Sequence, residues 1–179
     1  YAHKGIDGLM RGTAIDKAAR LAGRISGDST VAYAIALSRA VESALGIAPP
    51  ERAVWLRVVM AELERIANHL GDIGAICNDA AFALMHAHCG VLRERVLREA
   101  GAAFGHRLMM DRVVPGGVAA DLDVAAQTAL RTLIARIGRE FPPLIALFED
   151  TNTLQDRTVG TGILSPDLAR RFAAGGYVG

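Results

Sequence analysis

The feature that most constrains the fold of this chain is a stripe of apolar residues whose spacing alternates between three and four. The stripe consists of Leu56, Val59, Leu63, Ile66 and Leu70. Because an α-helix completes a turn in 3.6 residues, this spacing aligns these side chains on one face and predicts a helix that begins near Pro50. The opposite face carries Arg57, Glu64 and Arg65, so one side of the helix is expected to pack against a neighbour.

Other regions also have helical patterns. The sequence from Asp28 to Gly46 is apolar on most sides and predicts a central, buried helix. Another helix is expected from about Val91 to Glu99. A further stripe lies between Val124 and Phe148, but Pro142-Pro143 must kink or split that helix, because proline removes helix hydrogen bonds and clashes with the preceding turn.

The composition supports a mainly α fold. The chain is 51% hydrophobic but only 5% aromatic, which favours close-packed helices over an aromatic-rich sheet. Short β segments are expected at Arg107–Val114, before a Pro-Gly-Gly turn, and at Asp156–Ile163. Ser165 is expected to cap a last short helix. No repeat or linker divides the sequence, so we predict a single domain over residues 1–179.

Charge and hydropathy argue against several classes of partner. The net charge of +1, with acidic and basic residues interleaved, indicates no nucleic-acid partner. No apolar run approaches the ~20 residues needed to cross a bilayer, so no direct membrane span is expected. Cys77 and Cys89 are expected to be reduced, mostly buried thiols. His86 and Cys89 could share a helix face, but two ligands are too few to predict a metal site.

The segment from Arg24 to Ala34 resembles the first metal-binding motif of nickel-iron hydrogenase large subunits, in which an Arg-x-Cys-Gly-x-Cys turn leads into a helix. Ser26 and Ser29 stand where that motif has its two cysteines. Soft thiolates select nickel and low-valent iron, whereas a serine hydroxyl is hard and stays protonated near neutral pH. A nickel-iron centre is therefore not expected. The loss of this cysteine pair resembles the quinone-site protein of respiratory complex I, which is called the D subunit of NADH-quinone oxidoreductase.

The resemblance continues over most of the chain. It includes segments 1–7, 45–58, 62–70 and 115–122, in the same order as in that family. Within the first motif, Arg24-Ile25-x-Gly27-Asp28 is closer to the energy-converting, formate-hydrogenlyase-like hydrogenases than to complex I. The resemblance implies a helical bundle of the type found in hydrogenase large subunits and in the complex I quinone-site protein, with short peripheral β segments. Because the sequence begins inside a family motif, we expect a central fragment of a longer large-subunit chain.

The resemblance also implies site residues. His3 matches a histidine of the family and Asp79 matches an aspartate, and in the family both residues are linked to protonation of reduced quinone. Asp7 is a conservative exchange at an acidic position of the motif. We therefore predict His3, Asp7 and Asp79 as catalytic, proton-handling groups, with Asp79 as a buried carboxylate. The former metal cavity, which would bind the acceptor, is expected to be lined by Arg24, Ser26, Gly27, Asp28 and Ser29.

The function implied by the resemblance is that of one component of a membrane-associated respiratory or hydrogenase-like oxidoreductase. Such a component passes electrons from an iron-sulfur small subunit to quinone or a related acceptor, at the cytoplasmic, inner face of the membrane. Two alternatives stay open: a nickel-iron hydrogenase large subunit with altered ligands, and a cofactor-free assembly subunit. Val114 replaces the arginine that precedes Pro-Gly-Gly in complex I, and Gly23 stands near the position of its quinone-binding tyrosine. The isolated chain is expected to be inactive.

Overall fold

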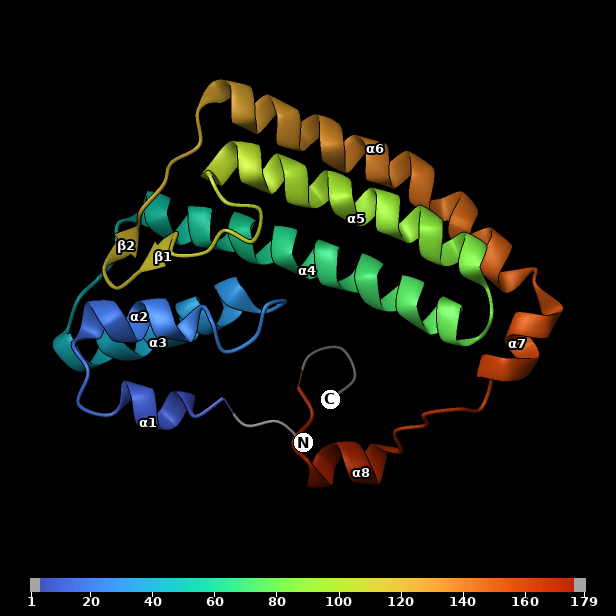
Figure 1. Ribbon diagram of the computed structural model, residues 1–179, viewed down its shortest axis with the longest axis horizontal. Helices are drawn as coiled ribbons and strands as arrows, with labels where there is room; N and C mark the ends of the chain where they lie inside the picture. The colour runs from blue at the N-terminus through green and yellow to red at the C-terminus, as the bar shows by residue number, and fades with distance from the viewer. Residues whose placement is uncertain (1–3, 176–179) are drawn as a thin grey trace.

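Three long helices form the body of the protein: α4 (Glu51–Asp79), α5 (Ala83–Phe104) and α6 (Val124–Glu149) (Figure 1). In the view of Figure 1, α4 and α6 run from left to right, and α5 lies between them and runs in the opposite direction. The computed structural model describes residues 4–175. The remaining helices are α1 (Ile6–Met10), α2 (Ile15–Ala22), α3 (Thr30–Leu45), α7 (Asn152–Thr158) and α8 (Pro166–Arg171). The mainly α prediction is confirmed.

The most extensive packing in the described chain joins α4 to α5. Of the stripe predicted for α4, Leu56, Leu63 and Leu70 are each at most 6% exposed, and Val59 and Ile66 are half-buried against the same core. A Cβ added to Gly74 would lie 3.0 Å from Cys89 Cβ, so a residue without a side chain is needed where the two helices approach. The predicted helix 91–99 is the middle of α5, which is longer because it pairs with α4 along much of its length.

Helix α3 and a small β-hairpin cover another side of α4. The hairpin pairs β1 (Val113–Val114) with β2 (Gly117–Val118) in antiparallel register. The prediction that α3 is buried on most sides is wrong, because Tyr33 and several alanines are exposed. Alanine raises the apolar content of a helix but exposes little apolar surface, so such a helix can bury one face and leave the others in solvent.

The helix stripe between 124 and 148 is confirmed as α6, but Pro142 and Pro143 do not split it. Both prolines lie on exposed turns of α6. The carbonyl groups that lose their helical donors there can therefore be satisfied by water. Burial of Leu130 and Leu133 against the common core supplies the packing that keeps the preceding turns in place.

Two strand predictions need correction. The β segment expected at Arg107–Val114 is reduced to the two residues of β1, and no strand forms at 156–163. There the chain continues α7 and then turns, because α7 buries Leu154 against Cys77, Met85 and Cys89. Both cysteines are free and buried, as predicted, and burial raises the pKa of each thiol.

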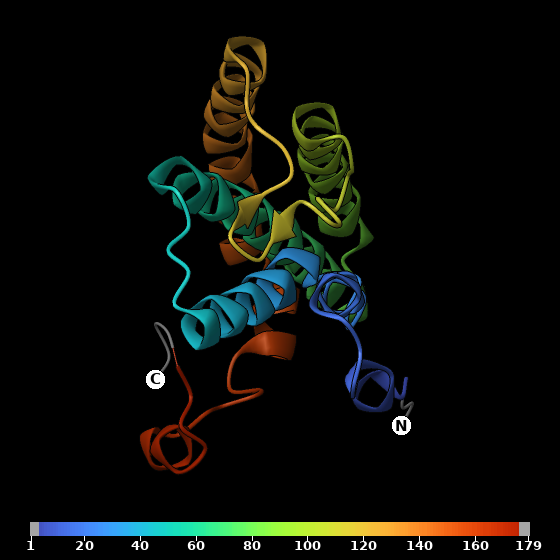
Figure 2. The ribbon, with the colours of Figure 1, turned by 90° about the vertical axis from the view of Figure 1, so that its left-hand side faces the viewer.

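Helix α8 lies apart from the three-helix body, and the turned view of Figure 2 shows the same separation. Ser165 caps it as predicted, since its hydroxyl accepts a hydrogen bond from the backbone N–H of Leu168 at 3.3 Å. Helix α8 is therefore peripheral, whereas the hairpin shares the main hydrophobic core with α3, α4, α5 and α6.

A buried ion pair joins α3, α4 and the hairpin. Arg57 donates to the carboxylate of Glu42 at 2.6 and 3.1 Å, and also to the carbonyl oxygens of Val114 and Gly117 at 2.8 and 2.9 Å. The backbone N–H of Gly116 donates to Glu42 at 2.8 Å. Arg57 is thus buried by partners distant in the sequence, although its helix position placed it opposite the apolar stripe.

Candidate functional site

The loop that connects α2 to α3, residues 23–29, lies alongside the middle of α4 (Figure 1). Asn68 on α4 donates from its side-chain amide to the backbone carbonyl of Asp28 at 2.5 Å. Lys4 donates from Nζ to the carbonyl of Ile25 at 2.8 Å, so the N-terminal segment reaches the same loop. The loop carries the predicted residues Ser26, Gly27, Asp28 and Ser29.

Glu64 holds the start of α3 against α4. Its two carboxylate oxygens accept hydrogen bonds from the backbone N–H groups of Val31, at 2.6 Å, and of Ala32, at 3.0 Å. The first N–H groups of a helix have no partner within the helix, and Ser29 makes no side-chain cap here. Glu64 therefore serves as a cap supplied by another helix. Burial raises the pKa of Glu64, and the nearby charge of Asp28 raises it further.

Asp28 is the charged group at the tip of the loop. The hydroxyl of Ser26 donates to its carboxylate, and this hydrogen bond lowers the pKa of Asp28. The positive charges of Arg93 and Lys4 lower it further. Asp28 is therefore ionised near neutral pH, and the proton of the Ser26 hydroxyl is directed to it.

Two adjoining recesses open beside this loop. We call the first the loop recess; it has a cavity volume of about 10 Å³, room for about one water molecule, and its lining includes Gly27, Asp28, Glu64, Asn68, Arg93, Arg107 and Met109. We call the second the helix recess; it has a cavity volume of about 300 Å³, and its lining includes Asp28, Asn68, Gly71, Asp72, His86, Arg93 and Glu94. Asp28, Asn68 and Arg93 line both.

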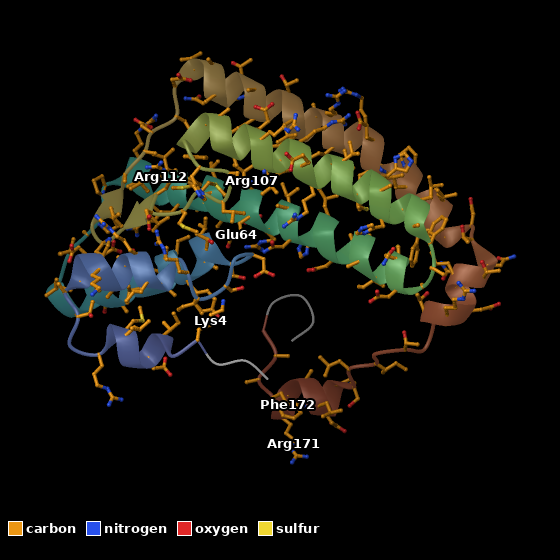
Figure 3. All side chains as sticks on the ribbon, in the orientation of Figure 1. Lys4, Glu64, Arg107, Arg112, Arg171 and Phe172 are labelled. Atoms are coloured by element: carbon orange, nitrogen blue, oxygen red, sulfur yellow. The ribbon has the colours of Figure 1, made fainter. Side chains whose placement is uncertain are left out.

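Arg93 on α5 is the cation common to the two recesses. It is half-buried, and a Cβ on Gly71 would lie 3.2 Å from its Nε, so the guanidinium group passes over the glycine. Arg107, by contrast, donates to Glu94 at 2.7 Å. Within residues 4–175, Arg93 makes no direct ion pair, and its charge is available to a ligand. Figure 3 shows Glu64 between Lys4 and Arg107 in that view.

Arg24 has a supporting position. Its guanidinium group makes two parallel hydrogen bonds, at 2.7 and 2.8 Å, to the carboxylate of Asp111 in the segment between α5 and the hairpin. This contact lowers the pKa of Asp111 and raises that of Arg24. Asp111 adopts a left-handed backbone conformation with φ 61°, which the contact helps to hold. Arg24 thus links the loop to the segment between α5 and the hairpin. It lines neither recess.

The structure brings together some of the predicted site residues but not all. Gly27 and Asp28 line the loop recess, and Ser26 contacts Asp28. Ser29 is half-buried at the start of α3 and lines neither recess. His3 lies outside the described residues.

The two predicted aspartates are on the surface. Asp7 is exposed on α1. Asp79 is exposed at the end of α4, so the expectation that it is buried is wrong. It lies eleven residues beyond Asn68, which corresponds to about 16 Å along the helix axis. The end of α4 is open to solvent because the chain turns there into α5. The catalytic roles of His3, Asp7 and Asp79 stay predictions.

Sequence reasoning does not identify Glu64, Asn68 or Arg93 as parts of the recesses. It assigns Glu64 to the polar face of its helix, where a charged side chain normally faces water. One signal could have indicated otherwise: Glu64 and Asn68 are four residues apart, and therefore on one helix face, while the helix after Ser29 lacks a strong capping sequence of its own.

The side chains of the loop do not fit a nickel-iron centre. Serine hydroxyls replace both thiols of the motif, and the Ser26 hydroxyl is already bonded to Asp28. Cys77 and Cys89 are buried elsewhere, near α7. Among the described residues, no three His, Cys, Asp or Glu side chains are placed so that they could share a metal ion.

The helical arrangement is that of a respiratory or hydrogenase-type large subunit. The family described as "Respiratory-chain NADH dehydrogenase, 49 Kd subunit" matches residues 78–178, which is more than half of the chain. The chain therefore belongs to the complex I 49 kDa subunit family, which also includes hydrogenase large subunits.

The curated relatives include both hydrogenase-type and NADH-quinone oxidoreductase subunits. The chain is 30% identical over 174 residues to formate hydrogenlyase subunit 5 of Escherichia coli, which covers 97% of this chain and 31% of that protein. It is 33% identical over 185 residues to a D subunit of NADH-quinone oxidoreductase from Salinispora arenicola, covering 99% of this chain and 46% of that protein. The chain thus spans less than half the length of these two relatives.

A solved structure has the same fold. A chain of the membrane-bound sulfane sulfur reductase, described as an archaeal respiratory membrane complex, superposes with a TM-score of 0.87 at 20% identity, over 94% of this chain and 45% of that one. The match confirms the predicted helical bundle of this family. Among residues 4–175, no helix combines the length and apolar character needed to cross a bilayer.

Proposed function

We propose that this chain is part of the large subunit of a membrane-associated oxidoreductase that passes electrons from an iron-sulfur partner subunit to quinone or a related acceptor. The acceptor binds in the helix recess, beside the site loop, because the loop recess has room for only about one water molecule. The large subunit lies at the cytoplasmic face of the membrane and is held there by other subunits of its complex. Family membership and the NADH-quinone oxidoreductase relative support this setting.

The observation that carries the proposal is the loop itself. It leads into α3 as the hydrogenase motif leads into its helix, but it presents hydroxyl groups and an ionised Asp28 beside Arg93, which makes no direct ion pair within residues 4–175. Such a site suits a neutral organic acceptor that becomes more negative on reduction, because a fixed cation stabilises that charge. It does not suit a soft metal pair.

Reduction of a quinone to a quinol takes up two electrons and two protons. In the proposed reaction the iron-sulfur partner supplies the electrons, and carboxyl or imidazole groups of the large subunit supply the protons. His3, Asp7 and Asp79 are the candidates from the resemblance. Because Asp79 is exposed about 16 Å along α4 from Asn68, it would take part as a relay toward solvent and not as a direct donor at the recess.

A hydrogenase with altered ligands is the second candidate. The identity with formate hydrogenlyase subunit 5 and the 28% identity over 171 residues with hydrogenase-4 component G, both of Escherichia coli, favour it. In this alternative, residues of the remaining polypeptide hold the metals. A third candidate, a cofactor-free assembly subunit, is consistent with a bundle whose stability comes from its apolar core.

The experiment that separates these candidates is metal analysis of the full-length protein purified without oxygen from its own host. We expect no stoichiometric nickel. Stoichiometric nickel, with hydrogen uptake, would refute the proposal and support the hydrogenase alternative. Nickel-free protein that binds a quinone analogue supports the acceptor site, whereas nickel-free protein that binds none supports the assembly role.

Substitution of Arg93 tests the site directly. In the intact complex, Arg93→Gln is expected to weaken binding of a quinone analogue by about tenfold or more, since it removes a charged hydrogen-bond donor. Arg139→Gln is the control, because Arg139 is exposed on α6 and lines neither recess. The predicted proton donors are tested by replacing His3 and Asp79; unchanged acceptor-dependent turnover would refute their roles.

A further inference from the structure

Two side chains of helix α4, one turn apart, form hydrogen bonds with the loop of residues 23–29 and with the start of α3 that follows it. Glu64 accepts from the backbone N–H groups of Val31 and Ala32, just after the loop. Asn68 donates to the carbonyl of Asp28, within the loop. Because residues i and i+4 lie above one another on a helix, one face of α4 engages both the donors and the acceptor of this segment. We call Glu64 and Asn68 the α4 clamp.

The loop has little else of its own to fix its junction with α3. Ser29, the residue before α3, makes no side-chain cap. The side chain of Thr30 is 2% exposed, yet its hydroxyl has no hydrogen-bond partner in the described chain. The first-turn amides therefore depend on a carboxylate from α4. Hydrogen bonds to an ionised acceptor are stronger than neutral ones, so the strength of the contact between Glu64 and the first-turn amides depends on the charge state of Glu64.

The surroundings of Glu64 determine that charge state. The loop places Asp28 near it, α5 contributes Arg93 to the same recess, and the segment after α5 contributes Arg107. From α3 the first-turn amides of Val31 and Ala32 donate to it. On α4 itself, Glu62 and Arg65 are exposed and pair with each other at 3.2 Å. Burial and the Asp28 charge raise the pKa of Glu64, and the two amides oppose this rise.

We propose that Glu64 and Asn68 are positioning residues for the 26–29 loop, and that proton uptake by Glu64 releases one of its two amide contacts and loosens the loop. A protonated carboxyl keeps only one strong acceptor oxygen. The shape of the loop recess then depends on pH. The consequence for acceptor binding rests on the proposed function, whereas the behaviour of the loop does not.

The test is hydrogen exchange at the Val31 and Ala32 amides of the ligand-free protein across a pH series, corrected for intrinsic exchange. In the unaltered protein, protection of at least one of these amides should fall about tenfold as Glu64 is protonated. In Glu64→Gln, protection should stay low and independent of pH. Glu62→Gln, on the same helix but exposed, should behave like the unaltered protein. Equal protection and equal pH profiles in Glu64→Gln would overturn the proposal.

A second measurement uses only the unaltered protein, so it can be made even if Glu64→Gln fails to fold. The carboxyl carbon signal of Glu64 and the amide signals of Val31 and Ala32 are followed by NMR in the unaltered protein. The three signals should shift with pH around one common midpoint. Amide signals of Val31 and Ala32 that do not shift as Glu64 titrates would overturn the proposal.

Binding of a quinone analogue extends the test to function. Its affinity should depend on pH in the unaltered protein through the Glu64 titration, and this dependence should disappear in Glu64→Gln. A dependence that persists in the variant would overturn the link between the clamp and the site. If the unaltered protein binds no analogue at any pH, the proposed function fails, and the amide measurements still decide whether the clamp exists.

Discussion

Glu42 and Arg57 illustrate how a charged pair can become part of a helical core. Each side chain is 6% exposed, and the pair is completed by backbone groups of the hairpin, so the charges are well satisfied. Removing one partner of such a pair leaves the other charge buried without compensation. The pair therefore fixes where the Pro-Gly-Gly hairpin lies on α3 and α4.

Replacing Arg57 is expected to cost far more stability than replacing an exposed arginine of the same helix. Arg57→Ala should lower the free energy of unfolding by about 3–5 kcal/mol, because Glu42 and two carbonyl groups lose their donor. Arg65→Ala, which breaks an exposed pair with Glu62, should change it by less than about 1 kcal/mol. Urea unfolding measures both. Similar losses in the two variants would contradict a structural role for the buried pair.

The two glutamates that accept from other elements should respond to pH in opposite directions. The Arg57 contact lowers the pKa of Glu42 below 4.5, so its stabilisation is present above that range and is lost as pH falls through the folded-state value. Burial raises the pKa of Glu64 above 4.5, so its ionisation costs stability as pH rises through the folded-state value.

These opposite signs give a prediction for matched variants. Relative to Glu42→Gln, the unaltered chain should lose its advantage in free energy of unfolding as the medium becomes more acidic than pH 4.5. Relative to Glu64→Gln, the unaltered chain should lose free energy of unfolding as the pH rises above 4.5. Urea titrations at several pH values measure both differences. Parallel pH profiles for the two variants would show that the assigned environments are wrong.

At this scale, the sequence predicts residue types better than their partners. The motif identifies the serine pair and Asp28, and the structure places Gly27 and Asp28 at a recess. Periodicity alone puts Arg57 and Glu64 on a polar face, because it contains no information about contacts with other elements. Their partners lie in α3 and the hairpin, between 15 and 60 residues away in the sequence.

At the scale of helices and strands, long apolar stripes are reliable predictors and short segments are not. The stripe of α4 predicts its burial correctly, and the stripe of α6 persists despite its two prolines. Local composition predicts a strand at 156–163, but burial of Leu154 in α7 decides otherwise. For a segment this short, one tertiary contact outweighs the local preference.

The close crossing of α4 and α5 at Gly74 gives a prediction at this scale. Gly74→Leu should lower the free energy of unfolding by about 1–3 kcal/mol, because even its Cβ would press on Cys89 at 3.0 Å. Gly138→Leu in α6 is the control, since nothing lies within 4 Å of its Cβ position; it should be neutral or stabilising by up to about 1 kcal/mol. Thermal unfolding of both variants measures the difference. A Gly74→Leu variant as stable as the control would mean that the helices do not meet there.

At the scale of the whole molecule, the described chain divides into a packed body and a thin extension. The body includes α7, whose Leu154 is 1% exposed against α4 and α5. The extension, residues 159–175, contains α8 and exposes large apolar side chains, including Ile163 and Phe172 at 76% and 71%. Helix α8 has no extensive packing with any other described element. Figure 3 shows Arg171 on α8, away from the three-helix body.

Removal of the extension should therefore leave the stability of the body intact, whereas a single truncation in α7 should not. Deleting residues 159–179 is expected to change the free energy of unfolding of the 179-residue chain by less than about 1 kcal/mol, because the described part of this segment, residues 159–175, makes few buried contacts. Leu154→Ala should lower it by about 2–5 kcal/mol, because it leaves a cavity beside Cys77 and Cys89. Urea unfolding compares the two. A deletion as damaging as Leu154→Ala would show that the extension is part of the folding unit, and that the body ends beyond α7.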